Sequence, residues 1–453
     1  TGSNCGSTPT GIGLDRAEIG HCQPDDFVLE SAASEEGLLL QHRGADGAQH
    51  CARHHEQLLA AERRQDRSRA AAHFGAGGGD ESGHRCHQFD ADALRGFDMF
   101  WILGGEALFG ALLILTGWAG WQWGDTQMHH SEWNGFRFYD LIFPLFIFLS
   151  GVALGLSPKR LDKLPMHERL PVYRHGVKRL FLLLLLGILY NHGWGTGAPA
   201  DPDKIRYASV LGRIAFAWFF AALLVWHTRL RTQVLVALGI LVAYGAAQLW
   251  LPFPGGQAGV LSPTESINAY VDSLLLPGVS YQGRTPDPEG LLSTLPAVVN
   301  ALAGVFVGHF IVKSHPKGEW AKVGLLSVAG GVCLDLGWLL DGVIPVNKDL
   351  WTSSFVLVTS GWSMLLLALF YALVDVLKWQ KLAFVFVVIG TNAIIIYLAS
   401  SLVDWKYIAQ SVFGGVIAAL PENAQPLAAV IGLLTVQWLV LYWMYRRNIF
   451  VRI

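Results

Sequence analysis

From Leu94 to its C-terminal end, the sequence repeats apolar stretches separated by polar connections. Each stretch has about 17–25 residues, and a helix of that length crosses about 30 Å of hydrocarbon. Helices are expected because lipid offers no hydrogen-bond partners to a backbone. Only 15% of the residues are charged, against about 25% in soluble domains. We therefore predict an all-α polytopic membrane protein with about ten spanning helices: 95–118, 140–157, 179–195, 207–227, 233–252, 290–312, 323–341, 352–376, 383–403 and 426–445.

The Lys and Arg residues of the connections divide unevenly between the two sides of this predicted membrane. Seventeen lie on the side that includes Lys159 and Arg160, and six lie on the other. Because Lys and Arg accumulate in cytoplasmic connections, we predict that both termini are cytoplasmic, which requires an even number of spans. The expected localisation is a bacterial inner membrane, with the lipid bilayer as a partner.

Residues 1–90 differ in composition from the rest, with no Trp, Tyr or Met and only three Phe. Such a segment cannot bury enough apolar surface to offset its ordering entropy. We expect 1–90 to be a disordered or non-native tail and 91–453 to be the membrane domain. The possible metal ligands here fit no zinc spacing, so we expect no metal: Cys51, His54, His55, Cys86 and His87. The net charge of −2 gives no indication of nucleic-acid binding.

The connection before the second predicted span is unusually polar. It holds His130, Trp133 and Asn134, and Asp140 begins the span. A carboxylate at this point suits the positive end of the helix dipole, so a capping role is one interpretation of Asp140. The other is that Asp140 orients His130, which then acts as a general base near neutral pH. The sequence leaves both open.

Further polar residues lie in or beside the predicted spans. Arg206 and Arg213 are seven residues apart and share one helix face. Ionisable residues inside a membrane are functional candidates by default. Together these residues predict a polar cavity within the helix bundle, and the remaining members of the set are Asp287, Glu289, Asn347, Lys348 and Asn392.

At these residues the chain resembles the heparan-α-glucosaminide N-acetyltransferase family and its bacterial relatives. The resemblance runs from about Asp92 to the C-terminus and leaves 1–90 uncovered. The motifs that carry it, in the family's order, are 92–96, 130–135, 140–144, 206–213, 270–272, 287–290, 344–351 and 390–394. One departure is that the family's Asn shortly upstream of the catalytic His is missing, and Glu106 is the nearest polar residue.

The resemblance implies a membrane acyltransferase domain over 91–453, which moves acetyl from cytoplasmic acetyl-CoA to the amine of a glucosamine-like sugar on the periplasmic side. His130 matches the family's catalytic histidine. We expect Asp140 to orient it, Asn134 or Asn392 to donate to an oxyanion, and Trp133 to stack on the sugar. An acetyl-His intermediate and direct transfer both stay open, and a homodimer is possible for this family. The expected sugar-binding residues are Arg206, Arg213, Asp287, Glu289, Asn347, Lys348 and Asn392, and those expected to meet the acetyl-CoA phosphates are Arg95, Lys159 and Arg160.

Polar groups near the middle of a membrane also suit a transporter. The alternative function is therefore a transporter for N-acetylglucosamine or a related sugar that performs no chemistry. A scaffold without a ligand is a weaker alternative, because polar residues in spans carry a cost.

Overall fold

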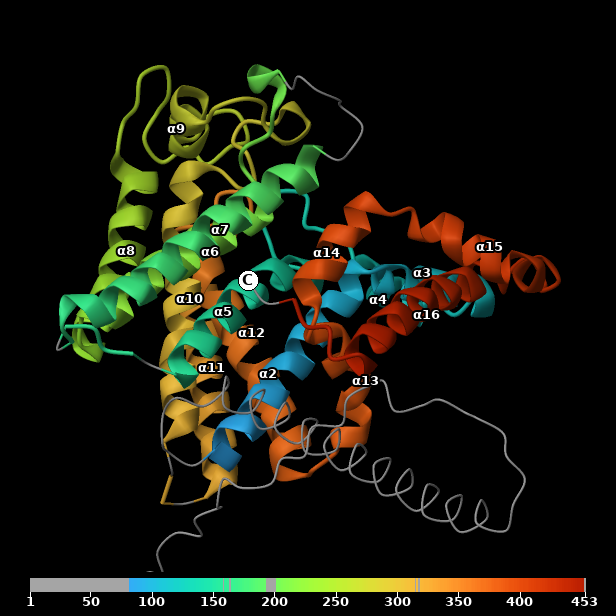
Figure 1. The fold of residues 1–453 in the computed structure, drawn as a ribbon. Coiled ribbons are helices and arrows are strands. Elements are labelled where there is room, and N and C mark those ends of the chain that lie inside the picture. The colour runs from blue at the N-terminus through green and yellow to red at the C-terminus, as the bar shows by residue number, and fades with distance from the viewer. Residues whose placement is uncertain are drawn as a thin grey trace, which may run out of the picture. The chain divides into compact units, whose positions relative to one another are not determined.

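The computed structural model describes residues 81–157, 159–162, 164–192, 201–313, 315–316 and 318–451. Over these ranges the chain is built from helices and contains no strand (Figure 1). Cys51, His54 and His55 lie outside the described residues, as do the side chains of Cys86 and His87. The helices are α2 Glu81–Ile102, α3 Leu108–Thr116, α4 Gly120–Gln127, α5 Phe138–Leu156, α6 Met166–His192, α7 Val210–His227, α8 Leu230–Trp250, α9 Ile267–Leu275, α10 Leu291–Val312, α11 Glu319–Asp341, α12 Ser353–Tyr371, α13 Gln380–Gly390, α14 Ala393–Leu402, α15 Trp405–Ala418 and α16 Gln425–Arg446.

Seven helices in the described ranges are long and apolar enough to cross a membrane, or nine if each of two bent pairs is one span. The all-α prediction is confirmed, whereas ten spans and the sides of the termini stay predictions. α6 overlaps the predicted span 179–195 but is not among these seven helices or the bent pairs.

Two predicted spans are broken. The first bends by 65° between Ile102 and Gly105, and the ninth bends by 55° between Gly390 and Ala393. At the first break, Gly104 has φ 121°, a conformation that residues with a Cβ rarely adopt. These breaks place short stretches of non-helical backbone within the bundle, which is tolerated where that backbone is buried or lines a cavity.

The bundle is organised around α5, which packs most extensively against α10 and also contacts α7, α12 and α2 (Figure 1). Gly151 and Gly155 on α5 face Gly304 and Gly308 on α10. A Cβ on Gly304 would lie 2.0 Å from the Phe148 carbonyl oxygen, and one on Gly151 would lie 1.9 Å from that of Ala301. Small residues four apart on both helices therefore let the two backbones approach closely.

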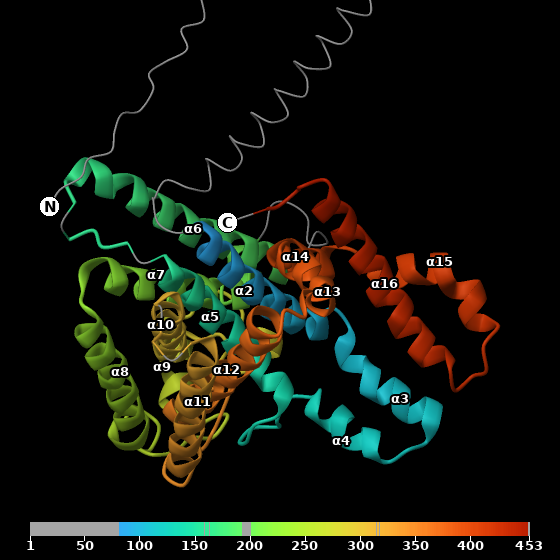
Figure 2. The ribbon, with the colours of Figure 1, turned by 90° about the horizontal axis from the view of Figure 1, so that it is seen from below.

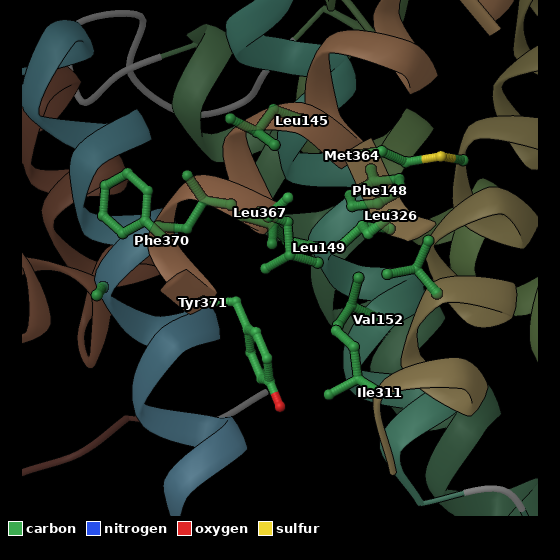
Figure 3. Packing of buried hydrophobic residues seen from close by; sticks show 14 of the residues in the cluster. Leu145, Phe148, Leu149, Val152, Ile311, Leu326, Met364, Leu367, Phe370 and Tyr371 are labelled. Carbon is green, nitrogen blue, oxygen red and sulfur yellow. The ribbon is translucent and has the colours of Figure 1, made fainter. Parts of the chain in front are cut away.

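Apolar side chains of α5 fill the space toward α12 and α10. Figure 3 shows Leu145, Phe148 and Leu149 of α5 facing Leu367 and Phe370 of α12. All five are buried. Because apolar side chains in this part of the bundle are closely packed, their contacts fix α5 in place. The start of α5 therefore provides a rigid base for the polar residues that surround it.

Helices α3, α4, α15 and α16 form a group on one side of α5 and α10, and α8 lies on the other side (Figures 1 and 2). Of these, α4 and α15 fall in segments that the sequence analysis treated as connections, 119–139 and 404–425, and α9 falls in the connection 253–289. All three are shorter than a spanning helix, so a search for long apolar stretches does not find them.

Candidate active site

The site forms where the connection before α5 meets the connection before α12. The side chain of Asn347, which is fully buried, donates to the Trp133 carbonyl at 3.0 Å and to Asn134 Oδ1 at 3.1 Å. Its own oxygen accepts from the Leu350 N–H at 2.8 Å. The Gly135 N–H donates to the Val346 carbonyl at 2.7 Å. These bonds fix two segments together that are more than 200 residues apart in sequence.

His130, Asp140 and Lys348 meet beside this junction. His130 Nδ1 lies 2.8 Å from Asp140 Oδ1. Lys348 Nζ lies 2.9 Å from His130 Nδ1 and 3.1 Å from Nε2, and 3.6 Å from Asp140 Oδ1. The Asp140 side chain is fully buried, whereas that of His130 is 51% exposed. The buried carboxylate of Asp140 therefore contacts a histidine, His130, that is exposed enough for a ligand to reach.

Asp140 both caps α5 and contacts His130. Its Oδ2 accepts from the backbone N–H of Arg137 at 3.1 Å and of Ser131 at 3.2 Å, while Oδ1 faces the imidazole. The two roles that the sequence left open are therefore compatible. A carboxylate acceptor at Nδ1 favours the tautomer with its proton on Nδ1 and the lone pair on Nε2, as a general base requires.

Two charged groups at the junction have shifted pKa values. Burial lowers the pKa of Lys348 below its usual value, although the charges of Asp140 and Asp349 oppose this shift. Burial also raises the pKa of Asp349, and the charges of Lys348 and Arg284 oppose that shift. A lysine with a lowered pKa has a larger neutral fraction near neutral pH than an exposed one.

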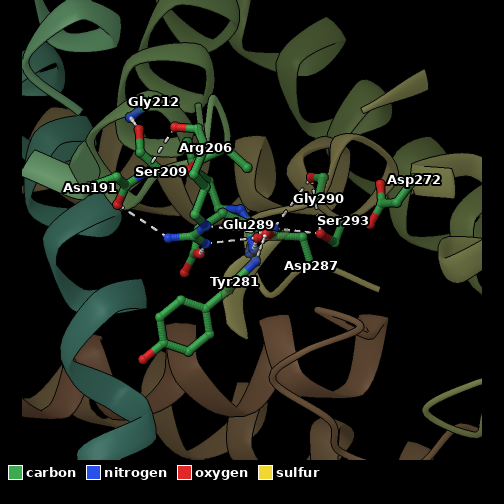
Figure 4. Close-up of polar contacts among 12 residues, drawn as sticks. Asn191, Arg206, Ser209, Gly212, Asp272, Tyr281, Asp287, Glu289, Gly290 and Ser293 are labelled. Atoms are coloured by element: carbon green, nitrogen blue, oxygen red, sulfur yellow. Dashed lines mark hydrogen bonds and ion pairs between the residues drawn. The ribbon is translucent and has the colours of Figure 1, made fainter. Parts of the chain in front are cut away.

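Arg206 is the centre of a second polar cluster, which Figure 4 shows. Its guanidinium donates to Asp287 Oδ1 at 2.9 Å and Oδ2 at 3.2 Å, and it also contacts Glu289 and the Asn191 side chain. Burial alone would raise the pKa of Asp287, but the bonds and charge of Arg206 hold it below its usual range. Burial keeps the pKa of Glu289 above its usual range. The paired carboxylates hold the 201–209 segment against the segment before α10.

Arg213 lies on α7, whereas Arg206 precedes this helix and forms an extended bridge with Gly278. The prediction that the two arginines share one helix face is therefore wrong. Arg213 is fully buried, donates to Ser293 and stacks on the Trp351 ring, 4.6 Å from its centroid. Its neighbour Asp272 accepts from the Leu291 N–H at 2.9 Å, and burial raises the pKa of Asp272 to about 6. Nε and Nη1 of Arg213 are buried without a hydrogen-bond partner within the ranges that the structure describes.

A cavity of about 680 Å³ links His130 to a pair of arginines farther along the bundle. At one end it is lined by His130, Lys348 and Glu289, and at the other by Arg95 and Arg179. Aromatic and aliphatic side chains of α5, α6 and α14 line the middle. Its volume is within the range of ligand pockets, which is about 300–1,000 Å³. Among the described residues, no group of His, Cys, Asp and Glu could hold a metal ion.

The structure brings six of the predicted site residues to the wall of this cavity: His130, Trp133, Arg206, Glu289, Lys348 and Arg95. Asp140 contacts His130 without lining the cavity, and Asn347 holds the connections before α5 and α12 together. Asn392 bonds to the backbone of Ile449 and Val451 instead of pointing into the cavity. The predicted residues that do not line it are Asp140, Asn134, Asp287, Asn347, Asn392, Arg213, Lys159 and Arg160.

Arg179 is a cavity residue that the sequence analysis did not select. Its guanidinium stacks on the Trp218 ring, with 4.1 Å between the carbon Cζ and the centroid, and its Nε is buried without a hydrogen-bond partner in the described part of the chain. Arg95, its neighbour in the cavity wall, is paired with Asp92 at 2.6 Å. Arg179 is the first residue of the predicted span 179–195, whereas α6 already begins at Met166. The sequence therefore did not indicate that the Arg179 side chain lines a cavity.

Glu106 lies at the bend that follows α2, close to His130. Tyr139 donates to the Glu106 carboxylate at 2.9 Å, and the Tyr139 ring lies 4.8 Å from the imidazole of His130. Glu106, Tyr139 and His130 also line a second cavity of about 520 Å³ beside α3 and α16. The Glu106 carboxylate is therefore hydrogen-bonded to Tyr139, whose ring packs beside His130. Among the described residues, no hydrogen bond joins Glu106 to the imidazole itself.

The arrangement defines a class of protein: a helical membrane protein with a buried carboxylate behind a reachable histidine, at one end of an internal cavity. Heparan-alpha-glucosaminide N-acetyltransferase from Mus musculus is 29% identical to this chain over 331 residues, covering 61% of the chain and 49% of the mouse protein. The protein of the same name from Homo sapiens is 29% identical over 386 residues, covering 72% and 55%.

These similarities confirm the predicted resemblance as a distant one. The chain spans about half the length of the curated relatives it matches, and no protein-family model matches it. The apolar helices of the described residues support a multi-pass membrane protein, which is distantly similar to these N-acetyltransferases.

Proposed function

We propose that this protein transfers acetyl from acetyl-CoA to the amine of a glucosamine-like sugar, with His130 as the base. The observation that carries the proposal is the His130–Asp140 contact at the end of a cavity whose other end holds Arg95 and Arg179. The distant N-acetyltransferase relatives support the same chemistry.

The arginine end of the cavity suits the phosphates of acetyl-CoA. Arg179 has a buried nitrogen that lacks a partner, and guanidinium groups bind phosphate oxygens through charge-assisted hydrogen bonds. We therefore assign the phosphates to Arg95 and Arg179. Lys159 and Arg160 are exposed on the α5–α6 connection, where Arg160 pairs with Asp162 at 2.6 Å. They remain candidates only for the entrance to the cavity.

The His130 end suits the acceptor amine. With its Nδ1 proton held by Asp140, His130 accepts a proton from the amine at Nε2 as the amine attacks, and returns a proton to the departing thiolate. Trp133 and Tyr281 supply aromatic surface for a sugar ring, and Glu289 supplies a carboxylate. The distribution of Lys and Arg supports our assignment of this end to the periplasmic side of a bacterial inner membrane and of the arginine end to the cytoplasmic side.

The test is to incubate the purified protein with acetyl-CoA, with and without glucosamine, and to measure free thiol. Thiol release that depends on the amine, together with N-acetylglucosamine in the product, is expected. Acetyl-CoA that is neither bound nor consumed, whatever amine is added, would contradict the proposal.

The break between α13 and α14 favours a second candidate, a sugar transporter. Gly390, Thr391 and Ala393 line the cavity at this break, and broken spans form the substrate sites of many transporters. Uptake of N-acetylglucosamine into protein-containing vesicles without acetyl-CoA would support transport. Thiol release without such uptake would exclude it.

A further inference from the structure

The amine of Lys348 lies within hydrogen-bond distance of both ring nitrogens of His130. An acceptor that loses its proton to His130 must bring its nitrogen within hydrogen-bond distance of Nε2. Lys348 Nζ is already 3.1 Å from Nε2 and 2.9 Å from Nδ1. The side chain of Lys348 also lines the same cavity as His130. The protein therefore carries its own primary amine beside the proposed base.

From this geometry we infer that Lys348 is an alternative acceptor, which the protein acetylates on Nζ when no sugar amine is bound. The inference rests on the proposed function, because it requires acetyl-CoA to reach His130. It adds a modification site and a consequence for regulation, since the acetylated lysine remains in the cavity.

The surroundings of Lys348 suit a nucleophilic amine. Its Nζ forms an ion pair with Asp140 Oδ1 at 3.6 Å, which is longer than an ordinary hydrogen bond. Asp140 is already occupied by His130 and two backbone N–H groups. The side chain is only 17% exposed, and burial lowers the pKa of Lys348, which increases the neutral fraction that can attack a thioester.

The reaction balances without any further reagent. The ammonium of Lys348 first gives one proton to solvent, and the neutral amine attacks the thioester carbonyl carbon. A C–N bond forms, the C–S bond breaks, and the second amine proton passes through His130 to the thiolate. The products are acetyl-Lys348, CoA with a free thiol and one released proton.

Acetylation would then stop transfer to sugars. The amide carries no positive charge, so its attraction to Asp140 is lost, and its added acetyl group occupies space beside Nε2 of His130. Because an amide is far more stable to hydrolysis than a thioester, the block persists. A protein supplied with acetyl-CoA but starved of acceptor would therefore inactivate itself.

The experiment uses the purified full chain and isotopically labelled acetyl-CoA, with and without glucosamine. Proteolysis and mass spectrometry then measure the label on each lysine, and free thiol is measured in the same samples. Lys204, whose side chain is 79% exposed, reports non-enzymatic labelling. We expect Lys348 to carry about tenfold more label than Lys204, and we expect glucosamine or His130→Gln to reduce only the label on Lys348.

A second readout follows activity over time. Wild-type protein preincubated with acetyl-CoA alone should progressively lose glucosamine-dependent thiol release, whereas Lys348→Arg should keep whatever activity it had before preincubation. Glucosamine-dependent thiol release with Lys348 labelled no more than Lys204 would overturn the self-acetylation while leaving the proposed function in place. An absence of both label and thiol release would overturn the two together.

Discussion

Replacing Asp140 with Asn probes the His130–Asp140 contact while keeping the shape of the side chain. Oδ2 of Asp140 accepts from two backbone N–H groups, those of Arg137 and Ser131. The amide oxygen of Asn must take this place, because an NH₂ group there would leave buried donors facing one another, at about 1–3 kcal/mol for each lost bond. The NH₂ group then faces His130 Nδ1.

The consequence is a change of tautomer. Facing a donor, Nδ1 becomes an acceptor and the imidazole proton moves to Nε2, so His130 loses the lone pair with which it accepts the amine proton. General base catalysis contributes about 10²–10⁴-fold, which corresponds to about 3–5 kcal/mol. We therefore expect Asp140→Asn to lower glucosamine-dependent thiol release by that factor, while α5 keeps its backbone cap.

Asp404→Asn is the matched control, because Asp404 caps α15 by accepting from the Tyr407 N–H at 2.9 Å and does not line the cavity. It should transfer acetyl at the wild-type rate. Melting temperatures in detergent show whether each variant is folded. A folded Asp140→Asn protein with a rate within about threefold of wild type would refute the orienting role, since that loss is under 1 kcal/mol.

Three further predictions test the packing, the electrostatics and the cavity. Gly304→Ala should lower the melting temperature, because overpacking against the Phe148 carbonyl costs about 1–3 kcal/mol. Gly239→Ala, where a Cβ meets nothing within 4 Å, should instead stabilise the protein by up to about 1 kcal/mol. Equal melting temperatures for the two variants would contradict the close approach of α5 and α10. Because the pKa of Asp272 is raised to about 6, stability should fall as pH rises from about 4 to 6 and its carboxylate ionises; Asp272→Asn should flatten this part of the melting profile, and an unchanged profile would count against the shift. Arg179→Gln should raise the KM for acetyl-CoA about tenfold, because a charge-assisted hydrogen bond to phosphate is lost. Arg174→Gln, at an exposed position, should leave this KM unchanged. An unchanged KM for Arg179→Gln would contradict the assignment of the phosphates to this end of the cavity.

The membrane class could be predicted from sequence because the length and apolarity of a spanning segment are local properties. The breaks at Gly104 and after Gly390 could not, since both segments read as continuous apolar stretches. Hydropathy also gives no indication of α4, α9 and α15, which are too short to span. Which helices contact one another, such as α5 and α10, depends on glycine spacing on two segments that are distant in sequence.

In the site, too, contacts between residues close in sequence could be predicted, whereas contacts between distant segments could not. His130 and Asp140 are ten residues apart and were paired from the sequence, because a helix start and a nearby histidine form a local pattern. The approach of Lys348 to His130 depends on Asn347 bonding across more than 200 residues, so only the family resemblance had placed both in one site. Arg179 was not separable from its basic neighbours until the course of α6 showed which of them faces the cavity.

The most direct test of the central claim compares wild-type protein with His130→Gln in the presence of acetyl-CoA and glucosamine. Formation of N-acetylglucosamine is followed by mass spectrometry, and folding by thermal melting. We expect product from the wild type and none above background from a His130→Gln protein that melts at the same temperature. Equal amounts of product from both proteins would contradict the role of His130 as the base.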